Sequence, residues 1–568
     1  MKTTQETMQG FAFLEHAAVL PPLVKGKEAR RHKVVIAGGG PVGLAAALAL
    51  ARYGIPSLVI EADRTVCKGS RAICLSRRSL EILDRLGALA PFLGKGLGWT
   101  AGRSFYQTTE ILRFEMPHGP EQRLMPMTNL QQYYVEQFLV DATEAQRDLI
   151  DIRWGTSLDA LTQDADGVML SLQTGGTSYA ATCDWLIACD GARSKARQEL
   201  GLRMNGTAYE GRYIIVDVAA DLDWPVERLA WFDPPSNPGR TMLMHRQPDN
   251  VWRLDYQLHP GEDAEAMTRP ENVLPVVEAH FRMLGVDKPW ELIWSSTYRA
   301  SALSLDKYVH GRVLFAGDAA HLVPIFGVRG LNSGFDDVFN LAWKLAYVIE
   351  GRSPLALLDS YSHERHFAWR TNITHAMKST EFMAPPSSGF RMMRDAVLSL
   401  ADKHPALRSL INPRQSSVIH YVDTPLNMIS ADDVSFRSGP APGAPLPEVK
   451  LADRNGSGAF LTVQLRDGFN LLVYGADDRM RAALAGWRGG PLAVTFISAE
   501  AGNAALHDTS GQFAATFDAA PVAVILVRPD GHICARWRGF DADAVMRAIS
   551  LASGHSNAAQ TQTIKVAS

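Results

Sequence analysis

Three glycines near the N-terminus have a spacing that suits the binding of phosphate. Gly38, Gly40 and Gly43 follow the pattern G-x-G-x-x-G, between a short apolar run at 34–37 and an Ala/Leu-rich segment at 44–53. The first glycine allows a tight turn, the second lets backbone N–H groups approach a pyrophosphate, and the third permits close packing of a helix on a strand. The pattern therefore predicts a strand, a turn and a helix that together bind a dinucleotide.

An acidic residue completes this pattern. A second apolar strand is predicted at 57–60, and it ends on Glu61. Glu61 follows Gly38 at about the distance, roughly 20 residues, at which an acid accepts hydrogen bonds from a ribose. A turn that only packs a helix against a sheet would need no such acid, so the order favours a dinucleotide site.

The composition is that of a globular protein with several domains. The chain has 568 residues, a length that is too great for a single core. Its content of 46% hydrophobic and 21% charged residues is typical of globular proteins. The net charge of −3 predicts no nucleic-acid partner and no attraction to an acidic membrane. Five cysteines without a C-x-x-C pair argue against a disulfide framework or zinc site and predict a cytoplasmic location. No apolar run is long enough to span a membrane, so no membrane association is predicted.

Two further motifs lie far along the chain from the first. Asp190 and Gly191 follow an apolar strand, and Gly317 and Asp318 follow another. After the second comes a glycine-containing loop, 324–332, and a long helix, so backbone N–H groups are again directed at an electron-rich group.

Other candidates are ambiguous from their spacing. Arg71 lies in a basic loop and could contact a cofactor phosphate or face the solvent. Gln132 lies in the first turn of a predicted helix, where it could face a ligand or be an ordinary surface residue. Arg253 and Asp255 share one face of a predicted strand at 251–257.

Together the three motifs resemble those of the single-component, group A FAD-dependent aromatic hydroxylases with the para-hydroxybenzoate hydroxylase fold. The resemblance covers about 33–370 and is closer to the phenol and 3-(3-hydroxyphenyl)propionate hydroxylase branch, because the chain beyond a Pro/Gly-rich linker looks like that branch's thioredoxin-like domain. It implies an α/β fold with a glutathione reductase-type, Rossmann-like FAD-binding domain, an inserted antiparallel-sheet substrate domain and a C-terminal thioredoxin-like domain. The C-terminal domain lacks a C-x-x-C pair, which favours a structural or dimerisation role over a redox role.

The same resemblance gives predicted domain boundaries. They are a tail at 1–32, an FAD-binding domain at 33–203 and 299–375, a substrate-binding sheet at 204–298, a helical region at 376–438, a linker at 439–447, the thioredoxin-like domain at 448–553 and a tail at 554–568.

The resemblance also implies which residues hold FAD. They are Gly38, Gly40, Pro41, Gly43, Glu61, Arg71, Gln132, Asp190, Gly191, Gly317, Asp318, Gly330, Leu331 and Asn332. Asp190 and Gly191 are implied to serve both FAD and NAD(P)H, and Asp318 to bind the ribityl chain. The backbone donors of Leu331 and Asn332 are implied to stabilise negative charge on the reduced flavin.

The implied reaction is the hydroxylation of a phenolic or related electron-rich aromatic compound. NADH or NADPH reduces FAD, and O₂ then gives a flavin C4a-hydroperoxide whose distal oxygen attacks the ring. The protein must exclude water and help to remove a phenolic proton. The predicted partners are therefore a small aromatic substrate and O₂, and the branch implies a homodimer.

The substrate end of the site is less clear. Pro324 is implied to lie near the reactive flavin carbon, and Arg253 at the boundary between flavin and substrate. Asp255 is a further catalytic candidate, and Trp231, Tyr256 and His321 could contact the substrate or only pack in the interior; Asp255 and Tyr256 cannot both face the pocket of a regular strand. Some relatives have a histidine for the substrate hydroxyl where this chain has Ile73, so this end has diverged.

Three other functions compete with this interpretation. An FAD oxidase or dehydrogenase would use the same scaffold without inserting oxygen. A flavin-dependent halogenase would need a W-x-W-x-I-P signature, which the sequence lacks. A non-catalytic FAD-binding protein would hold a flavin that NAD(P)H does not reduce.

Overall fold

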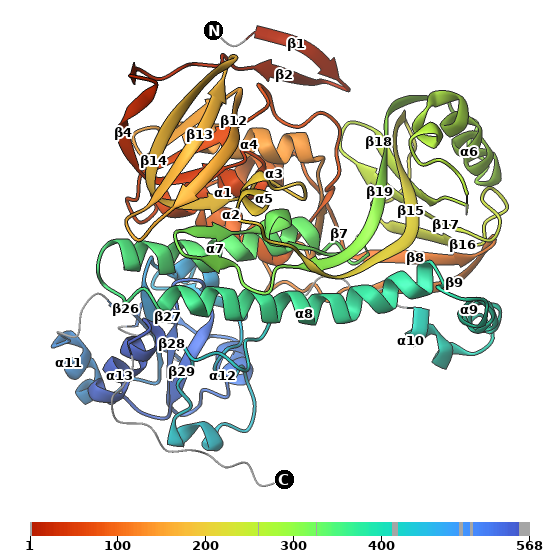
Figure 1. The fold of residues 1–568 in the computed structure, drawn as a ribbon. Helices are drawn as coiled ribbons and strands as arrows, with labels where there is room; N and C mark the ends of the chain where they lie inside the picture. The colour runs from red at the N-terminus through yellow and green to blue at the C-terminus, as the bar shows by residue number, and fades with distance from the viewer. Residues whose placement is uncertain are drawn as a thin grey trace. The chain divides into compact units, whose positions relative to one another are not determined.

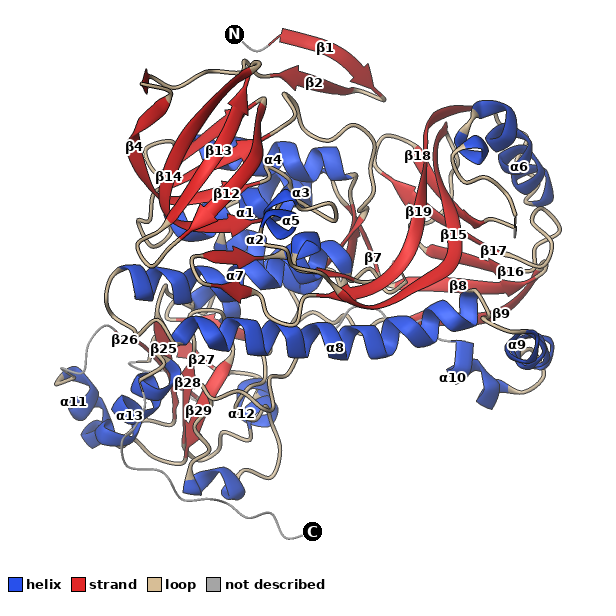
Figure 2. Ribbon diagram, viewed as in Figure 1, coloured by secondary structure: helices blue, strands red, loops and turns tan. Residues whose placement is uncertain are grey.

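The computed structural model describes residues 3–259, 261–324, 326–411, 418–487, 492–499 and 504–555 (Figures 1 and 2). The chain divides into two compact units. The first comprises Met1–His118, Leu124–Val338 and Trp369–Ser417, and the second Gly119–Arg123, Phe339–Ala368 and Val418–Ser568. The long helices α7 (Gly330–Ile349) and α8 (Leu357–Met383) each contribute residues to both units.

A nine-stranded sheet carries the glycine motif. Its strands are β3 (Leu23–Val24), β4 (Lys27–Ala37), β5 (Ser57–Glu61), β11 (Ile150–Trp154), β12 (Thr156–Gln163), β13 (Val168–Thr174), β14 (Thr177–Ala188), β20 (Val309–His310) and β21 (Val313–Phe315). The strands β11, β5, β4, β14 and β21 pair in parallel, and β12 to β14 form an antiparallel meander. The parallel strands are buried, which explains their continuous apolar runs: Val34, Val35 and Ile36 are fully buried.

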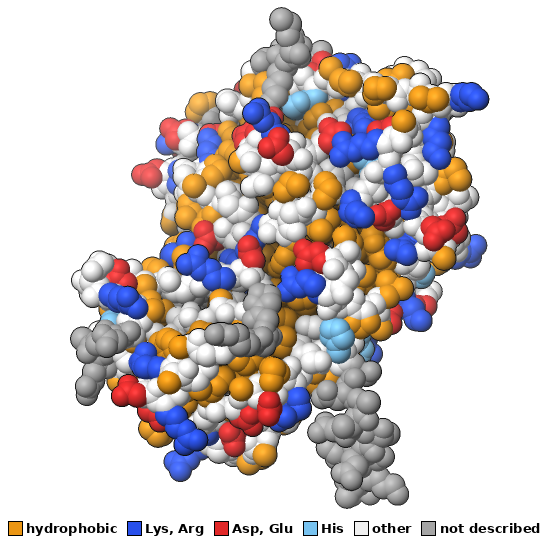
Figure 3. Space-filling model, turned by 90° about the vertical axis from the view of Figure 1, so that its left-hand side faces the viewer, with side chains coloured by type: hydrophobic (Ala, Val, Ile, Leu, Met, Phe, Trp, Pro, Cys, Tyr) orange, Lys and Arg blue, Asp and Glu red, His pale blue; other side chains and the backbone are white. Residues whose placement is uncertain are grey.

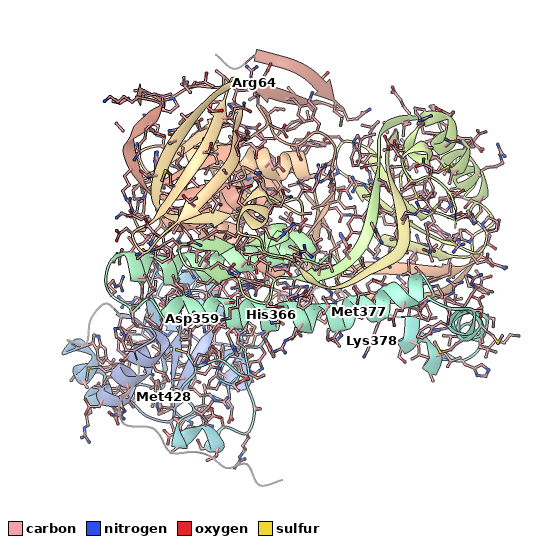
Figure 4. The ribbon with its side chains drawn as sticks, in the orientation of Figure 1. Arg64, Asp359, His366, Met377, Lys378 and Met428 are labelled. Atoms are coloured by element: carbon pink, nitrogen blue, oxygen red, sulfur yellow. The ribbon has the colours of Figure 1, made fainter. Side chains whose placement is uncertain are left out.

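The beginning of the chain differs from the predicted irregular tail. Residues 3–15 form a hairpin of β1 (Thr3–Met8) and β2 (Phe11–Glu15), and β4 begins at Lys27. The strand was missed because polar residues interrupt its apolar pattern. Glu28 is nevertheless buried, since Arg153 binds both of its carboxylate oxygens at 2.9 and 3.0 Å. Arg64, labelled in Figure 4, helps to hold the hairpin by donating to the carbonyl of His16 at 3.0 Å.

Helices and a small sheet connect the glycine motif to the rest of the first unit. The helices are α1 (Pro41–Ala51), α2 (Arg77–Arg85), α3 (Leu89–Lys95), α4 (Gln132–Glu144), α5 (Lys195–Glu199), α9 (Ser388–Leu400) and α10 (Arg408–Ile411). The small sheet pairs β6 (Cys74–Ser76), β10 (Met127–Asn129) and β7 (Leu97–Trp99). Helix α1 begins after Gly40, with Pro41 in its first turn and no side chain capping its N–H groups.

A second, eight-stranded sheet lies in the first unit. In order it comprises β22 (His321–Leu322), β19 (Trp290–Ser304), β15 (Asn205–Ala220), β18 (Val251–Gln257), β17 (Thr241–Gln247), β16 (Arg228–Phe232), β8 (Ala101–Tyr106) and β9 (Thr109–Glu115). Apart from the parallel pair β16–β8, its pairs are antiparallel. Helix α6 (Pro270–Met283) packs its Val273, Val277 and Phe281 on one face. The sequence predicted this sheet from 204–298 alone, because the pairing of β8 with β16 is not local and leaves no pattern in the sequence.

The second unit contains a seven-stranded sheet. In order it comprises β24 (Gly458–Phe460), β23 (Lys450–Asp453), β27 (Leu506–His507), β26 (Leu492–Ser498), β25 (Phe469–Tyr474), β28 (Ala523–Val527) and β29 (Ile533–Trp537). Its helices include α11 (Asp478–Ala485), α12 (Gln512–Phe517) and α13 (Ala542–Ala552). Short 3-10 turns occur in the chain at Ala266–Thr268, Gly317–Ala319, Pro405–Leu407, Ala431–Ser435 and Leu461–Gln464.

A cluster of buried charges lies inside the second unit. Glu364 accepts hydrogen bonds from Lys344 at 2.7 Å and from Arg528 at 2.9 Å, and Arg528 also pairs with Asp530. All four side chains are almost completely buried. Because an isolated buried charge is strongly unfavourable, the mutual pairing is what makes their burial tolerable.

The surface carries charges of both signs. On the face shown in Figure 3, Lys and Arg side chains are interspersed with Asp and Glu. Among the described residues, no helix is both long and apolar enough to cross a membrane.

Candidate active site

A cavity of about 580 Å³ lies within the first unit. Its wall comes from the turn before α1, the loop before β6, the end of β14, the 3-10 turn at 317–319, the start of α7 and the inner face of the eight-stranded sheet. The cavity therefore joins the elements that the sequence predicted for a cofactor to those predicted for a substrate. Its volume is in the range typical of small-molecule sites.

The glycine turn has the geometry that a phosphate requires. At Gly43 a Cβ atom would lie 1.9 Å from the carbonyl oxygen of Gly38, and at Gly38, where φ is +100°, it would lie 2.4 Å from that of Cys189. At Gly40 a Cβ atom would meet no protein atom within 4 Å. Gly40 and Pro41 line the cavity, so the uncapped N–H groups of α1 are available to a ligand.

Glu61 stabilises this turn. Its Oε2 accepts a hydrogen bond from the backbone N–H of Gly39 at 2.6 Å, and its Oε1 accepts one from that of Asp63 at 2.9 Å. Burial raises the pKa of the Glu61 carboxyl. Glu61, Gly38 and Gly43 support the cavity wall without being part of its lining as described.

Asp190 has one carboxylate oxygen available. Its Oδ2 accepts a hydrogen bond from the backbone N–H of Ala196 at 2.9 Å, whereas its Oδ1 is buried without a partner among the described residues. Gly191, with φ of +76°, lines the cavity. An unsatisfied buried oxygen beside the cavity suits a ligand that donates a hydrogen bond.

Arg71 and Gln132 line the same cavity. The amide oxygen of Gln132 accepts from the N–H of Ala72 at 3.1 Å, and its amide nitrogen donates to Glu136 at 2.9 Å. Gln132 thus fixes the loop that carries Arg71, whose side chain is exposed.

The turn at Gly317–Asp318 is held from behind by α7. Asp337 accepts a hydrogen bond from the N–H of Gly317 at 3.0 Å and pairs with His321 at 2.7 Å. Asp318 lines the cavity, and desolvation by the surrounding protein raises the pKa of its carboxyl, although His321 and Arg71 oppose the shift. His321, a weaker substrate candidate from the sequence, is buried in this brace, outside the cavity lining as described.

The start of α7 forms another part of the wall. Gly330, Leu331 and Asn332 line the cavity. The side chain of Asn332 accepts from the N–H of Ser76 at 2.8 Å and donates to the carbonyl of Cys74 at 3.1 Å. This side chain is therefore engaged by the protein.

Arg253 is in the cavity wall but is engaged by the protein. Its Nε donates to Asp217 at 2.6 Å and its Nη2 to the other oxygen of Asp217 at 2.7 Å. The guanidinium also donates to the carbonyls of Ser70 and Arg71. Arg253 therefore fixes the loop of Arg71 to the sheet.

Asp255 faces the cavity from the same side of β18. It is buried, and it forms no hydrogen bond or ion pair in the part of the chain that the structure describes. Burial raises the pKa of its carboxyl to about 7, although Arg253 opposes the shift. Such a group can accept a proton near neutral pH.

Arg228 and His245 line the cavity but were not predicted as site residues from the sequence. Arg228 on β16 pairs in register with His245 on β17, and His245 with Arg253 on β18. Burial, Arg228 and Arg253 together lower the pKa of His245 to about 3, so its imidazole is neutral. The strand β16 was not predicted, and only its pairing would have placed Arg228 at the site.

Two residues that were candidates for substrate contact point away from the cavity. Trp231 and Tyr256 lie in the hydrophobic cluster that packs against α6. Alternation along β18 forces this result, because Arg253 and Asp255 occupy the cavity face and Tyr256 therefore points to the other. Trp231 packs its ring edge-to-face on His280, with centroids 4.6 Å apart.

Ile73 lines the cavity, and its contact with a substrate stays a prediction. Pro324 is buried beside the cavity, which is lined by its neighbours Val323 and Phe326. Among the described residues no group of three or more His, Cys, Asp or Glu could hold a metal ion.

Two family models match the chain. The model described as an FAD binding domain matches residues 31–376, and the model described as an aromatic-ring hydroxylase C-terminal domain matches residues 439–554. A 3-(3-hydroxy-phenyl)propionate/3-hydroxycinnamic acid hydroxylase of Klebsiella pneumoniae is 28% identical over 92% of this chain and 95% of the relative. The hydroxylase of that name from Escherichia coli is 32% identical over 66% of this chain and 67% of the relative.

Solved structures share the fold. The flavin-dependent monooxygenase PieE, in complex with FAD and substrate, aligns with a TM-score of 0.76 at 24% identity, over 93% of this chain and 100% of that one. Aklavinone-11 hydroxylase, in a ternary complex with FAD and aklavinone, aligns with a TM-score of 0.73 at 22% identity over the same shares.

The cavity fits FAD, since it combines an uncapped helix start, a glycine turn open to a ligand and an unsatisfied carboxylate oxygen. An FAD-binding domain spans more than half of the chain, and a hydroxylase C-terminal domain follows it. This chain therefore belongs to the family of FAD-dependent aromatic-ring hydroxylases.

Proposed function

We propose that the protein hydroxylates a phenolic or related electron-rich aromatic compound with NAD(P)H and O₂. The observation that carries the proposal is the single cavity shared by Gly40, Asp318 and Asn332 at one part of its wall and by Asp255 at another. Bound FAD supplies the redox chemistry, which passes electrons from NAD(P)H to O₂ and delivers oxygen to the ring. The relatives named as hydroxyphenylpropionate hydroxylases support this reaction class.

The residues of the predicted cofactor set have distinct roles in this proposal. The backbone N–H groups after Gly40 would bind the pyrophosphate of FAD. Glu61, which lies beside the glycine turn, would accept hydrogen bonds from the ribose. Asp318 would bind the ribityl chain of FAD, and the backbone donors at Leu331 and Asn332 would stabilise negative charge on the flavin ring. Asp190 accepts a hydrogen bond through its unsatisfied oxygen.

Asp255 is proposed to accept the phenolic proton. Its pKa of about 7 gives it a substantial ionised fraction at neutral pH, and no described residue forms a hydrogen bond or ion pair with it. Removal of the proton makes the ring more electron-rich and so more reactive toward oxygen transfer. Ile215, Leu243 and Phe326 give this part of the cavity apolar walls that limit the access of water.

The boundaries predicted for the domains, a homodimer and a cytoplasmic location remain part of the proposal. Cys534 is buried and Cys67 lies in the other unit, so no thiol pair supports a redox function for the C-terminal domain. Light scattering after gel filtration would test the dimer.

Rapid-mixing measurement of flavin absorbance tests the proposed function. FAD-loaded protein is mixed with NADH or NADPH, with and without candidate phenols, and loss of the oxidised flavin band is followed. Acceleration by one phenol, together with a hydroxylated product, is expected. Fast reduction without any aromatic compound, yielding only hydrogen peroxide, would instead favour the oxidase alternative.

A further inference from the structure

A buried arginine faces the cavity without a partner. Arg228, the first residue of β16, lines the cavity with only 6% of its surface exposed. It forms no hydrogen bond or ion pair with any residue that the structure describes. Burial lowers the pKa of its guanidinium to about 10, so the side chain still carries its charge at neutral pH.

Neighbouring arginines of the same sheet have acidic partners. Arg103 and Arg113 bind the two carboxylate oxygens of Glu227 at 2.7 and 2.8 Å. Arg253 is paired with Asp217 at 2.6 Å. A buried charge without a partner is strongly unfavourable. Because no described acid pairs with Arg228, we expect a ligand to supply the compensating negative charge.

The groups nearest to Arg228 do not neutralise it. His245, its register partner, is neutral and has a buried Nδ1 without a hydrogen bond. Asp255 interacts electrostatically with Arg228, yet the two form no ion pair, and the Asp255 pKa of about 7 leaves part of this carboxyl protonated at neutral pH. The sheet-side wall, which is the part of the cavity wall formed by the eight-stranded sheet, thus presents the cation of Arg228 and the proton acceptor Asp255 as separate groups.

We infer that the aromatic substrate carries an ionised carboxylate in addition to its hydroxyl, and that Arg228 binds this carboxylate. The inference rests on the proposed function, because it takes the sheet-side wall as the substrate site. A guanidinium fork matches a carboxylate through two parallel N–H···O bonds. Arg228 would then select acidic phenols over neutral ones and leave Asp255 to serve the hydroxyl.

Paired binding measurements test this assignment. The probes are 3-hydroxybenzoate, 3-hydroxyphenylacetate and 3-(3-hydroxyphenyl)propionate, each compared with its uncharged primary amide. Binding to FAD-loaded protein is followed by the perturbation of flavin absorbance. At least one acid is expected to bind about 10- to 100-fold more tightly than its amide, as a charge-assisted pair to a buried arginine would produce.

Substitution of Arg228 then assigns the preference to this residue. In Arg228→Gln the acid-to-amide ratio should fall to about 1 while the affinity for the amide is kept. Arg228→Lys should retain part of the preference, since it keeps the charge and loses the fork. Arg113→Gln is the control, because Arg113 is an exposed arginine of the same sheet outside the cavity lining, and it should keep the full ratio.

Three results would overturn the assignment. The first is wild-type protein that binds every amide as tightly as its acid. The second is a preference for an acid that survives in Arg228→Gln. The third is an equal loss of affinity for acid and amide, which would place Arg228 at the hydroxyl instead.

Failure of the proposed function can be distinguished from failure of this inference. An acid preference that depends on Arg228, without any hydroxylated product, would remove the proposed reaction and leave the anion site. Hydroxylation without any preference for an acid over its amide would support the proposed reaction and remove the anion site. FAD content and thermal midpoint confirm that each variant is folded, and Arg228→Gln should fold well because it removes an unpaired buried charge.

Discussion

Arg253 and Asp217 form a two-bond ion pair at the cavity wall, with Nε–Oδ1 and Nη2–Oδ2 distances of 2.6 and 2.7 Å. Both side chains are almost completely buried. The same guanidinium holds the carbonyls of Ser70 and Arg71, so one residue connects the sheet to the cofactor loop. Arg253 is thus a positioning residue whose charge is balanced within the protein.

Removal of the acid from this pair should destabilise the protein. Asp217→Asn leaves Arg253 as a partly compensated buried charge, and the expected loss of unfolding free energy is about 3–5 kcal/mol. The loop of Arg71 should also loosen, which weakens the binding of FAD. Thermal unfolding and FAD titration measure the two effects. Glu278→Gln is the control, since its pair with Arg282 is exposed and should cost less than about 1 kcal/mol. Equal effects of the two substitutions would contradict the role of the buried pair.

The activity should follow the ionisation of Asp255. An acid that acts as a base must be ionised, so kcat/KM should fall as the pH drops below about 7, the pKa of this carboxyl. Asp255→Asn should reduce kcat by about 100-fold or more and remove the acidic limb of the profile. Steady-state assays across pH measure this, with the exposed Asp223→Asn as control. An unchanged acidic limb in Asp255→Asn would show that another group titrates.

The same carboxyl should also affect stability. Its pKa is raised in the folded state from 3.8 to about 7, so the folded protein holds a proton that the unfolded chain releases. Its contribution to stability is therefore fully present below about pH 3.8 and is lost as the pH rises toward about 7. In Asp255→Asn this loss between acidic and neutral pH should be absent. Denaturant unfolding at several pH values would detect the difference, and parallel curves for the two proteins would contradict the raised pKa.

Two glycine substitutions should separate packing from cofactor binding. Gly43→Ala places a methyl group 1.9 Å from the carbonyl oxygen of Gly38, so it should lower both the thermal midpoint and FAD affinity. Gly40→Ala meets no protein atom and has an ordinary φ of −72°, so the protein without FAD should keep its midpoint. Its methyl group would nevertheless occupy space beside the ligand and weaken FAD binding. Normal FAD affinity in Gly40→Ala would place the pyrophosphate elsewhere.

The charge cluster of the second unit should be essential to its stability. Glu364→Gln removes the acid shared by Lys344 and Arg528, and we expect a loss of about 3–5 kcal/mol. The exposed pair of Glu350 and Arg352 gives the control, for which Glu350→Gln should change little. Circular dichroism during thermal unfolding measures both, and similar midpoints for the two variants would contradict the stabilising role of the charge cluster.

The parts of the site predicted from sequence are those made by local turns. The order of strand, glycine turn, helix and Glu61 depends on residues that are close in the chain, so this motif can be recognised from the sequence. The turns at Asp190–Gly191 and Gly317–Asp318 follow apolar strands in the same manner. All three turns meet at one sheet because parallel strands end at the same edge.

The parts that were missed depend on pairing between distant strands. Arg228 reaches the cavity only because β16 lies beside β17, and the segment carries no alternating pattern since every residue of β16 is buried. The sequence left Trp231 and Tyr256 open between substrate contact and interior packing, because the register that fixes the face of each strand cannot be read from the sequence. The start of β4 was missed for a related reason. The charged residue Glu28 breaks the apolar pattern of the strand, and its partner Arg153, which makes its burial possible, is remote in sequence.

Labelled molecular oxygen tests the proposed hydroxylation. FAD-loaded protein is supplied with NADH or NADPH, a panel of phenols and isotopically labelled O₂, and the aromatic products are analysed by mass spectrometry. Hydroxylation should give a product with one labelled oxygen atom on the ring, formed in step with the consumption of NAD(P)H. Consumption of NAD(P)H with all of the label in hydrogen peroxide, for every phenol in the panel, would contradict it.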